Sequence, residues 1–216
     1  VYVMRVERRD GVSQLTLAHI TPTGTEELAV LEVASAPPHV PDVADFRLLA
    51  DGGSSVNHMP AICVIGSGGD IVLMPVDEEA SAPAEVVGSV DQGILAAAWS
   101  PEEDVLVLIT GGEKRLIVMT REFEVMSETM LSTEAFGDDQ PVNVGWGSKS
   151  TQFHGSEGKQ AAMAAANAPE ESDPRGPLVP EDDGLPRISW RGDGAFFVTS
   201  SAEASNDAVH RILRTY

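Results

Sequence analysis

The chain has 216 residues, and its 34 acidic side chains against 14 basic ones give a formal net charge of −20. Such a charge repels phosphate backbones over most of the surface, so the composition argues against wholesale nucleic-acid binding. The single cysteine, Cys63, excludes an intrachain disulfide and a cysteine zinc site and favours a reducing, intracellular setting. No apolar run approaches the ~20 residues that a membrane-spanning helix needs.

The first half of the chain predicts strands joined by short turns. Leu15 to Val33 and Ile62 to Met74 each place an apolar run, a turn and a second apolar run in order. Between them, Ala34 to Pro41 (ASAPPHVP) carries three prolines and predicts a connection, because proline cannot donate to a central sheet ladder. Gly66 to Asp70 (GSGGD) joins two strands and lacks the full dinucleotide-binding pattern, so we expect a hairpin turn with positive φ angles.

The second half contains two further hairpins and one irregular stretch. Leu106 to Met119 and Phe196 to Leu213 repeat the strand, turn and strand pattern, whereas only the first half of Thr151 to Gln160 fits it. The alanines of Gln160 to Asn167 favour a short helix. Ala164 to Gly184 combines prolines, small residues and six acids, which predicts an acidic insertion that is a long exposed loop or disordered.

These segments recur at a nearly fixed spacing. Ile65 and Ile109, which end two leading runs, lie 44 residues apart, and Val198 lies 89 residues further on. The tryptophans are spaced 47 and 44 apart, and each closes a short run of small or apolar residues: Trp99, Trp146 and Trp190. A period in the low forties is typical of propeller blades, each four strands long.

The fold prediction is therefore an all-β, WD-repeat-type β-propeller. Residues 1–216 are expected to form part of one propeller domain with about five blade units, the last lacking an outer strand after Tyr216. Because the chain begins at Val1 without a start methionine, we interpret it as a fragment of a larger protein. The three tryptophans are predicted to be structural residues on the innermost strands of three successive blades, where small neighbours allow close approach.

No residue pattern predicts catalysis. His154 has an acid and a base nearby, but no second titratable pair accompanies it, so a hydrogen-bonded structural histidine is the favoured interpretation. In Gly155 to Gln160 (GSEGKQ) the glycines are too close for a phosphate loop, and the residue after Lys159 carries no hydroxyl for magnesium. The pairs Glu102–Glu103 and Asp138–Asp139 are interpreted as solvated turns. No catalytic, cofactor-binding or metal-binding residue is expected.

The positive charges are unevenly distributed. Ten of the fourteen basic residues lie from Lys114 onward, among them Lys149, Lys159, Arg187, Arg191, Arg211 and Arg214. They could form a local basic strip on the later blades, or they could be scattered and individually solvated. Scattered lysines and arginines are the commoner arrangement, and we favour it.

Three blocks resemble a known family. Leu95 to Phe123, Phe136 to Ala162 and Pro186 to Ser200 are similar to the amino-terminal propeller of the largest Elongator subunit, the IKAP family. The specific part is VGWGSKSTQFHGSEGKQAA, from Val144 to Ala162, since the W-S-P and W-R-G-D-G turns would fit many WD-type propellers. The resemblance is strong from Leu95 to Ser200, about half the chain, and the insertion departs from the family in length and acidity.

The resemblance implies a non-enzymatic role. Members of this family are scaffolds with two WD-type propellers followed by a helical-repeat dimerisation region. Elongator adds a carboxymethyl-type substituent to carbon five of transfer RNA wobble uridines, using S-adenosylmethionine, an iron-sulfur cluster and acetyl-CoA on a different subunit. The implied partners are the other Elongator subunits, including the catalytic one, with a peripheral transfer RNA contact and no membrane or small-molecule partner. The implied location is the cytoplasm and in part the nucleus.

The specific block also supplies the predicted partner-binding residues. Phe153, His154, Glu157 and Lys159 are expected to present a contact loop, and the equally weighted alternative is that this loop only packs the irregular blade. A generic WD-type adaptor outside transfer RNA modification is the alternative function. A propeller hydrolase or sugar-binding enzyme is less favoured, because the paired carboxylates that glycosidic chemistry needs cannot be assigned.

Overall fold

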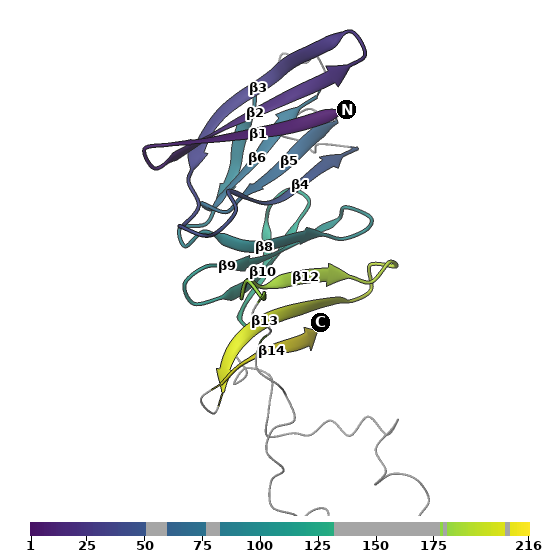
Figure 1. Cartoon of the computed structure of the whole chain (residues 1–216). Coiled ribbons are helices and arrows are strands. Elements are labelled where there is room, and N and C mark those ends of the chain that lie inside the picture. Colours follow the sequence, from purple (N-terminus) through teal and green to yellow (C-terminus); the bar gives the residue numbers. More distant parts are fainter. Residues whose placement is uncertain (51–59, 77–82, 132–177, 179–180, 206–207) are drawn as a thin grey trace, which may run out of the picture.

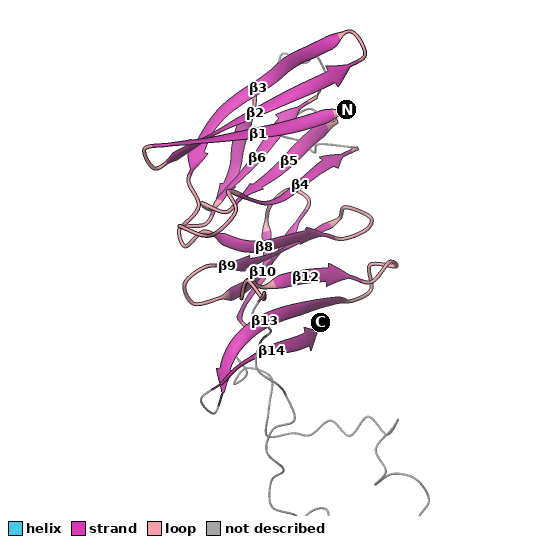
Figure 2. Cartoon of the chain, viewed as in Figure 1, coloured by secondary structure: helices cyan, strands magenta, loops and turns pink. Residues whose placement is uncertain are grey.

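The computed structural model describes residues 1–50, 60–76, 83–131, 178, 181–205 and 208–216. These residues form strands and connecting turns, with no helix among them (Figure 2). The strands build antiparallel sheets of three, four, four and three strands that follow one another along the molecule and are not closed into a ring (Figure 1). The all-β, blade-like architecture predicted from the period is thus confirmed.

In each sheet the strands pair in chain order. The first sheet contains β1 (Tyr2–Arg9), β2 (Val12–Thr21) and β3 (Gly24–Ala34). The second contains β4 (Val43–Leu49), β5 (Ala61–Gly66), β6 (Asp70–Pro75) and β7 (Glu85–Ser89). The third contains β8 (Ile94–Trp99), β9 (Val105–Thr110), β10 (Arg115–Thr120) and β11 (Val125–Met130). The fourth contains β12 (Arg187–Trp190), β13 (Phe197–Ser205) and β14 (Ala208–Thr215).

The predicted hairpins are confirmed wherever the structure describes them. They correspond to β2–β3, β5–β6, β9–β10 and β13–β14, and the proline-rich connection lies between β3 and β4. The small-residue runs before Trp99 and Trp190 are β8 and β12. The unit predicted at Thr151 to Gln160, the helix at Gln160 to Asn167 and most of the acidic insertion lie outside the described residues.

In the first sheet, the hairpin that matches β5–β6 is not the one predicted from the spacing, and the difference is one strand. Ser35 N donates to Gly11 O, and Ser67 N donates to Asp42 O at 2.9 Å. Both the turn after β1 and the β5–β6 turn therefore contact the 35–42 connection and lie on the same side of the stack. The β1–β2 hairpin, rather than β2–β3, therefore occupies the place that β5–β6 has in the second sheet. Spacing could not distinguish the two hairpins, because β2 pairs antiparallel with β1 on one side and with β3 on the other.

The first strands of the second, third and fourth sheets run side by side. β8 contacts both β4 and β12, as expected for innermost strands, and the Trp190 indole Nε1 donates to the Ala98 carbonyl at 3.2 Å. The Trp99 and Trp190 strands are therefore direct neighbours, whereas the sequence predicted one blade between them. The segment between them is long enough that their separation in the sequence equals about two repeat periods. Trp146 lies outside the described residues.

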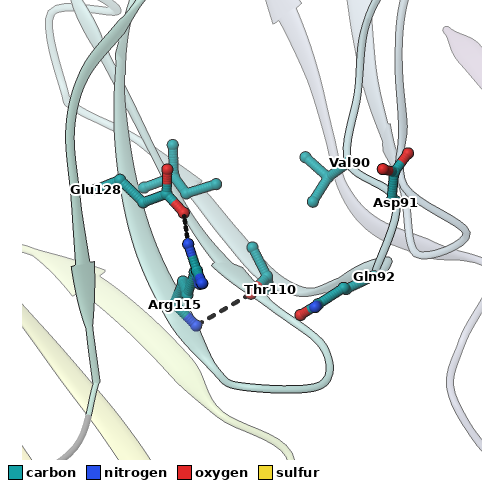
Figure 3. Close-up of a pocket in the computed structure, with 7 residues that line it drawn as sticks. Val90, Asp91, Gln92, Thr110, Arg115 and Glu128 are labelled. Carbon is teal, nitrogen blue, oxygen red and sulfur yellow. Dashed lines mark hydrogen bonds and ion pairs between the residues drawn. The ribbon is translucent and has the colours of Figure 1, made fainter.

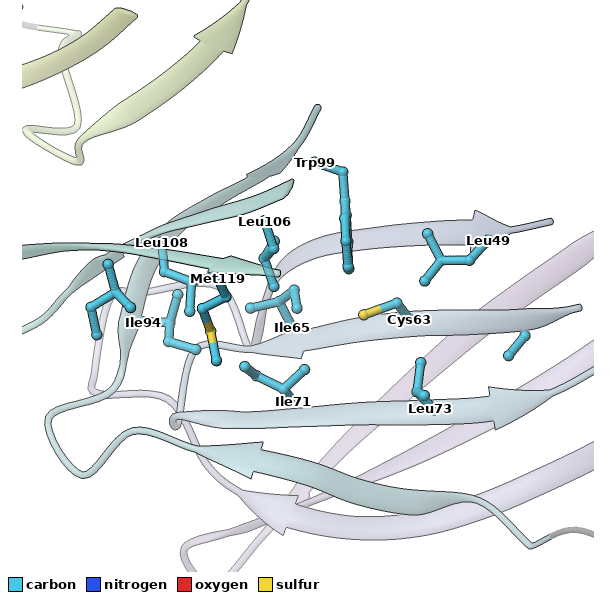
Figure 4. Close-up of a cluster of buried hydrophobic side chains, with 12 residues drawn as sticks. Leu49, Cys63, Ile65, Ile71, Leu73, Ile94, Trp99, Leu106, Leu108 and Met119 are labelled. Atoms are coloured by element: carbon cyan, nitrogen blue, oxygen red, sulfur yellow. The ribbon is translucent and has the colours of Figure 1, made fainter. Parts of the chain in front are cut away.

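An apolar core fills the space between the second and third sheets (Figure 4). Trp99, 4% exposed, packs there and meets Phe123 edge-on at 6.0 Å between ring centroids. Cys63 is also buried in this core, and burial raises the pKa of its thiol, so it acts as a small hydrophobe. The main members of the cluster are Leu49, Ile65, Ile71, Leu73, Ile94, Leu106, Leu108, Ile117 and Met119.

The fourth sheet carries a polar network beside its aromatic contacts. Arg214, whose side chain is 9% exposed, donates to Glu203 Oε1 at 2.6 Å and to Ser201 Oγ at 3.1 Å. Burial alone would raise the pKa of Glu203, but the hydrogen bonds from Arg214 and Ser201 outweigh it and hold that pKa below its ordinary value of 4.5. Lys114 of the preceding sheet donates to the Ala202 carbonyl at 3.0 Å, which links the two sheets.

Truncating Leu108 tests the inter-sheet core. Leu108 is fully buried between the second and third sheets, so Leu108→Ala should lower the free energy of unfolding by about 2–5 kcal/mol through lost transfer energy and a residual cavity. Val86→Ala, at a residue 46% exposed, is the control and should change stability by less than about 1 kcal/mol. Denaturant unfolding measures both, and equal losses would contradict the assigned core.

The Glu203 ion pair predicts a pH dependence. Because the folded-state pKa of Glu203 is lowered, its contribution to stability is present above the unfolded value and is lost as the pH falls through the folded value. The stability difference between the wild type and Glu203→Gln should therefore be constant at neutral pH and shrink below about pH 4.5. Unfolding curves from pH 7 to pH 3 provide the measurement. A difference that grew on acidification would have the wrong sign for this ion pair.

Candidate interaction surface

The described loops lie along the two sides of the stack, at the two ends of the strands (Figure 1). Loops held by a rigid scaffold are where binding residues concentrate. We call one end the turn end; its loops are 10–11, 35–42, 67–69, 90–93 and 111–114. The described loops at the opposite end are 22–23, 100–104, 121–124 and 191–196.

Backbone packs directly on backbone at the turn end. A Cβ added to Gly69 would clash with the Val90 carbonyl oxygen, and one added to Gly111 would clash with that of Gln92. Gly69 has φ +120° and donates its N–H to Gly66 O at 3.0 Å, which confirms the predicted hairpin turn with positive φ. Neighbouring loops therefore cannot move apart without losing contact along their main chains.

Two carboxylates at the turn end tie loops together. Asp42 Oδ1 accepts hydrogen bonds from Arg8 Nη2 at 2.6 Å and from Ser13 Oγ at 2.9 Å. Its partial burial favours the neutral acid, yet these hydrogen bonds prevail and lower the pKa of Asp42. Asp70 accepts from the Ala34 N–H at 2.8 Å and from the Ser89 hydroxyl at 3.1 Å. Both acids thus have structural partners.

At the opposite end, Glu103 bridges two sheets. Its carboxylate lies 3.4 Å from Arg47 Nε and accepts from the Ala50 N–H at 3.3 Å. Glu103 adopts φ +63°, a conformation that glycine takes at the matching position, Gly194, in the 191–196 turn. The interpretation of Glu102–Glu103 as a solvated turn is therefore wrong for Glu103. Its partner comes from the preceding sheet, and sequence spacing did not reveal that partner.

Five described arginines of the third and fourth sheets are paired with acids. Each forms an ion pair with a carboxylate at 2.5–3.1 Å: Arg115, Arg187, Arg191, Arg211 and Arg214. Asp182 holds Arg211, and hydrogen bonds from Arg211 and from the Gly184 N–H lower the pKa of Asp182 to about 2. These five residues do not form a basic strip, which agrees with the scattered arrangement. Lys149 and Lys159 lie outside the described residues.

A pocket opens at the turn end between the second and third sheets (Figure 3). Its volume is about 260 Å³, and its walls come from the β7–β8 loop and from strands β9, β10 and β11. The lining residues are Val90, Asp91, Gln92, Thr110, Arg115, Ile117 and Glu128. Sequence reasoning missed this site because its residues share no motif and meet only when the two sheets pack.

The predicted contact residues Phe153, His154, Glu157 and Lys159 lie outside the described residues, so their arrangement stays a prediction. Across the described ranges, no group of three or more His, Cys, Asp and Glu side chains could hold a metal ion. A search of the same ranges finds no helix that is long and apolar enough to cross a membrane.

Comparison with known proteins identifies relatives. The chain is 41% identical over 140 residues to Elongator complex protein 1 of Oryctolagus cuniculus, covering 65% of this chain and 10% of that protein. It is 38% identical over 158 residues to Elongator complex protein 1 of Schizosaccharomyces pombe, covering 72% of this chain and 12% of that protein. A Lactobacillus plantarum crystal structure aligns over 94% of this chain and 53% of its own at 9% identity, with a TM-score of 0.43, which is too low to support an argument.

The chain thus spans about a tenth of the length of these curated relatives. The family model described as the ELP1 first N-terminal β-propeller matches residues 5–216, a range that includes strands of all four described sheets. This match agrees with the sheet architecture and with the resemblance expected from the sequence blocks. The chain belongs to the ELP1 first N-terminal β-propeller family.

Proposed function

We propose that this chain is a non-catalytic scaffold propeller of an Elongator subunit. In this proposal it holds the catalytic subunit in a fixed geometry and so supports modification of transfer RNA wobble uridines. The observation that carries the proposal is the family match over residues 5–216, together with relatives named Elongator complex protein 1. The proposed location follows that of the assembly, in the cytoplasm and in part in the nucleus.

The rigidity of the loops supports a scaffold role. A partner that binds preformed loops loses less conformational entropy than one that must order them. At the turn end, backbone contacts at Gly69 and Gly111 and the hydrogen bonds of Asp42 and Asp70 fix neighbouring loops. These acids are occupied in holding the fold, which suits a surface that positions another protein.

Charge supports a protein partner over a broad transfer RNA interface. The chain carries a net charge of −20, and the five arginines described above are paired with carboxylates, so few of their N–H groups are free for phosphates. We infer that a transfer RNA contact made by this domain is peripheral. The main partner is then another Elongator subunit.

The contact loop of Phe153, His154, Glu157 and Lys159 gives a mutational prediction. His154→Ala together with Lys159→Ala in the full-length protein should reduce co-purification of other Elongator subunits without lowering the melting temperature, because exposed contacts add little to stability. Quantitative mass spectrometry and thermal unfolding measure the two effects. A lowered melting temperature without selective loss of a partner would show that the loop packs the domain instead.

The proposed function itself is tested with the tagged full-length parent protein in its own cells. Affinity purification followed by mass spectrometry should recover a radical-type acetyltransferase subunit, and depletion of the parent protein should remove the wobble-uridine modification. A different partner set with intact modification would contradict the proposal. The protein would then be a generic WD-type adaptor.

A further inference from the structure

The turn-end pocket lies between two complete sheets. Its walls come from the loop that joins the second sheet to the third and from strands of the third sheet. Each of these two sheets has four strands and a described neighbour on its other face. For the first and fourth sheets, the described residues include a neighbouring sheet on one face only. The shape of this pocket therefore does not depend on an uncovered face at either end of the stack.

The one cation in the pocket is already neutralised. Arg115 Nη1 donates to Glu128 Oε1 at 2.6 Å, and its Nε and Nη2 donate to Glu113 Oε2 at 3.0 and 2.7 Å. These hydrogen bonds raise the pKa of Arg115 and keep it charged beside two carboxylates. A phosphate or carboxylate ligand would have to displace an existing partner and approach like charges. The pocket is therefore unsuited to an anion.

The Asp91 and Glu128 carboxylates of the pocket, by contrast, can accept further hydrogen bonds. Among the described residues, none donates a hydrogen bond to the Asp91 side chain or to Glu128 Oε2. Figure 3 shows Asp91 on the β7–β8 loop and Glu128 on β11, on opposite sides of the opening. Two carboxylates, those of Glu113 and Glu128, already bind the Arg115 guanidinium, and Asp91 adds a third negative charge across the opening. The site therefore carries an excess of negative charge and calls for a donor-rich cation.

We propose that this pocket receives an arginine side chain from a protein partner. A guanidinium presents several N–H groups in a planar fork and can reach acceptors on both walls. Val90 and Ile117 add apolar surface to the lining, against which the methylene stem of an arginine packs while its head stays hydrated. The volume of about 260 Å³ accommodates one long side chain.

The walls are preformed. Gly112 adopts φ +54° and lies against the Gln92 side chain, whose Oε1 accepts from the Glu113 N–H at 3.4 Å. Thr110 Oγ1 accepts from the Arg115 N–H at 3.0 Å. The loop that carries Asp91 is thus fixed to the turn before β10, and an arginine would enter without the loop having to order first.

Saturation-transfer NMR with the full-length protein tests the site directly. The probes are N-acetyl-arginine amide, its neutral near-isostere N-acetyl-citrulline amide, and inorganic phosphate. We expect saturation of the arginine methylene protons in the wild type, binding about threefold weaker in Asp91→Asn, and binding about tenfold weaker when Glu128→Gln is added, as for partly exposed charge pairs. Glu124→Gln, an exposed acid in the 121–124 turn at the opposite end, is the matched control and should bind as the wild type does.

The outcomes separate the ligand classes. Equal signals from arginine and citrulline, or no change in the double variant, would overturn the proposal. Broadening of the phosphate resonance in the wild type that is absent in Arg115→Gln would show that the pocket binds anions. That result would also overturn the proposal. Unchanged melting temperatures show that the variants are folded. The probes do not depend on Elongator, so failure here leaves the proposed function standing, and failure of the proposed function leaves this site standing.

Discussion

Face-to-face packing of successive β-sheets is the constraint on which the rest of this protein depends. The core between the second and third sheets buries Trp99, Cys63 and Leu108 together, and such burial supplies most of the favourable free energy of folding. It also sets the distance between neighbouring loops. The backbone contacts at the turn end, the Glu103 bridge at the opposite end and the pocket between the sheets all follow from that spacing.

Polar residues in this fold mainly hold sheets and loops in place. Asp42, Asp70, Glu103 and Glu203 each bind partners from other elements, and five arginines of the third and fourth sheets form ion pairs with acids. The net charge of −20 nevertheless leaves many carboxylates without a basic partner, so selective recognition depends on which of these carboxylates line a pocket. Asp91 and Glu128 line the turn-end pocket, and in our proposal they add a selective site to the general electrostatic field of this strongly acidic protein.

Local patterns predicted much of the fold. Apolar alternation and turn residues located the hairpins, and the run before Trp99 matched β8, because these signals depend on residues close in sequence. Order in space was harder to predict. The predicted hairpin assignment was wrong by one strand in the first sheet. The sequence also predicted a blade between the Trp99 and Trp190 strands, which are in fact neighbours, because the long segment between them has the length of an additional repeat. The pocket could not be predicted, since its walls come from strands that pack without any shared motif.

The sheets form an open stack in which each one contacts its immediate neighbours. Such an arrangement behaves as a nearly one-dimensional array, with stability that is a sum of sheet terms and neighbour terms. A change in the fourth sheet, such as loss of the Arg214 network, is then felt mainly by the third sheet and hardly at all by the first. Energetic coupling among the four described sheets is therefore expected to be strongest between immediate neighbours and to weaken along the stack.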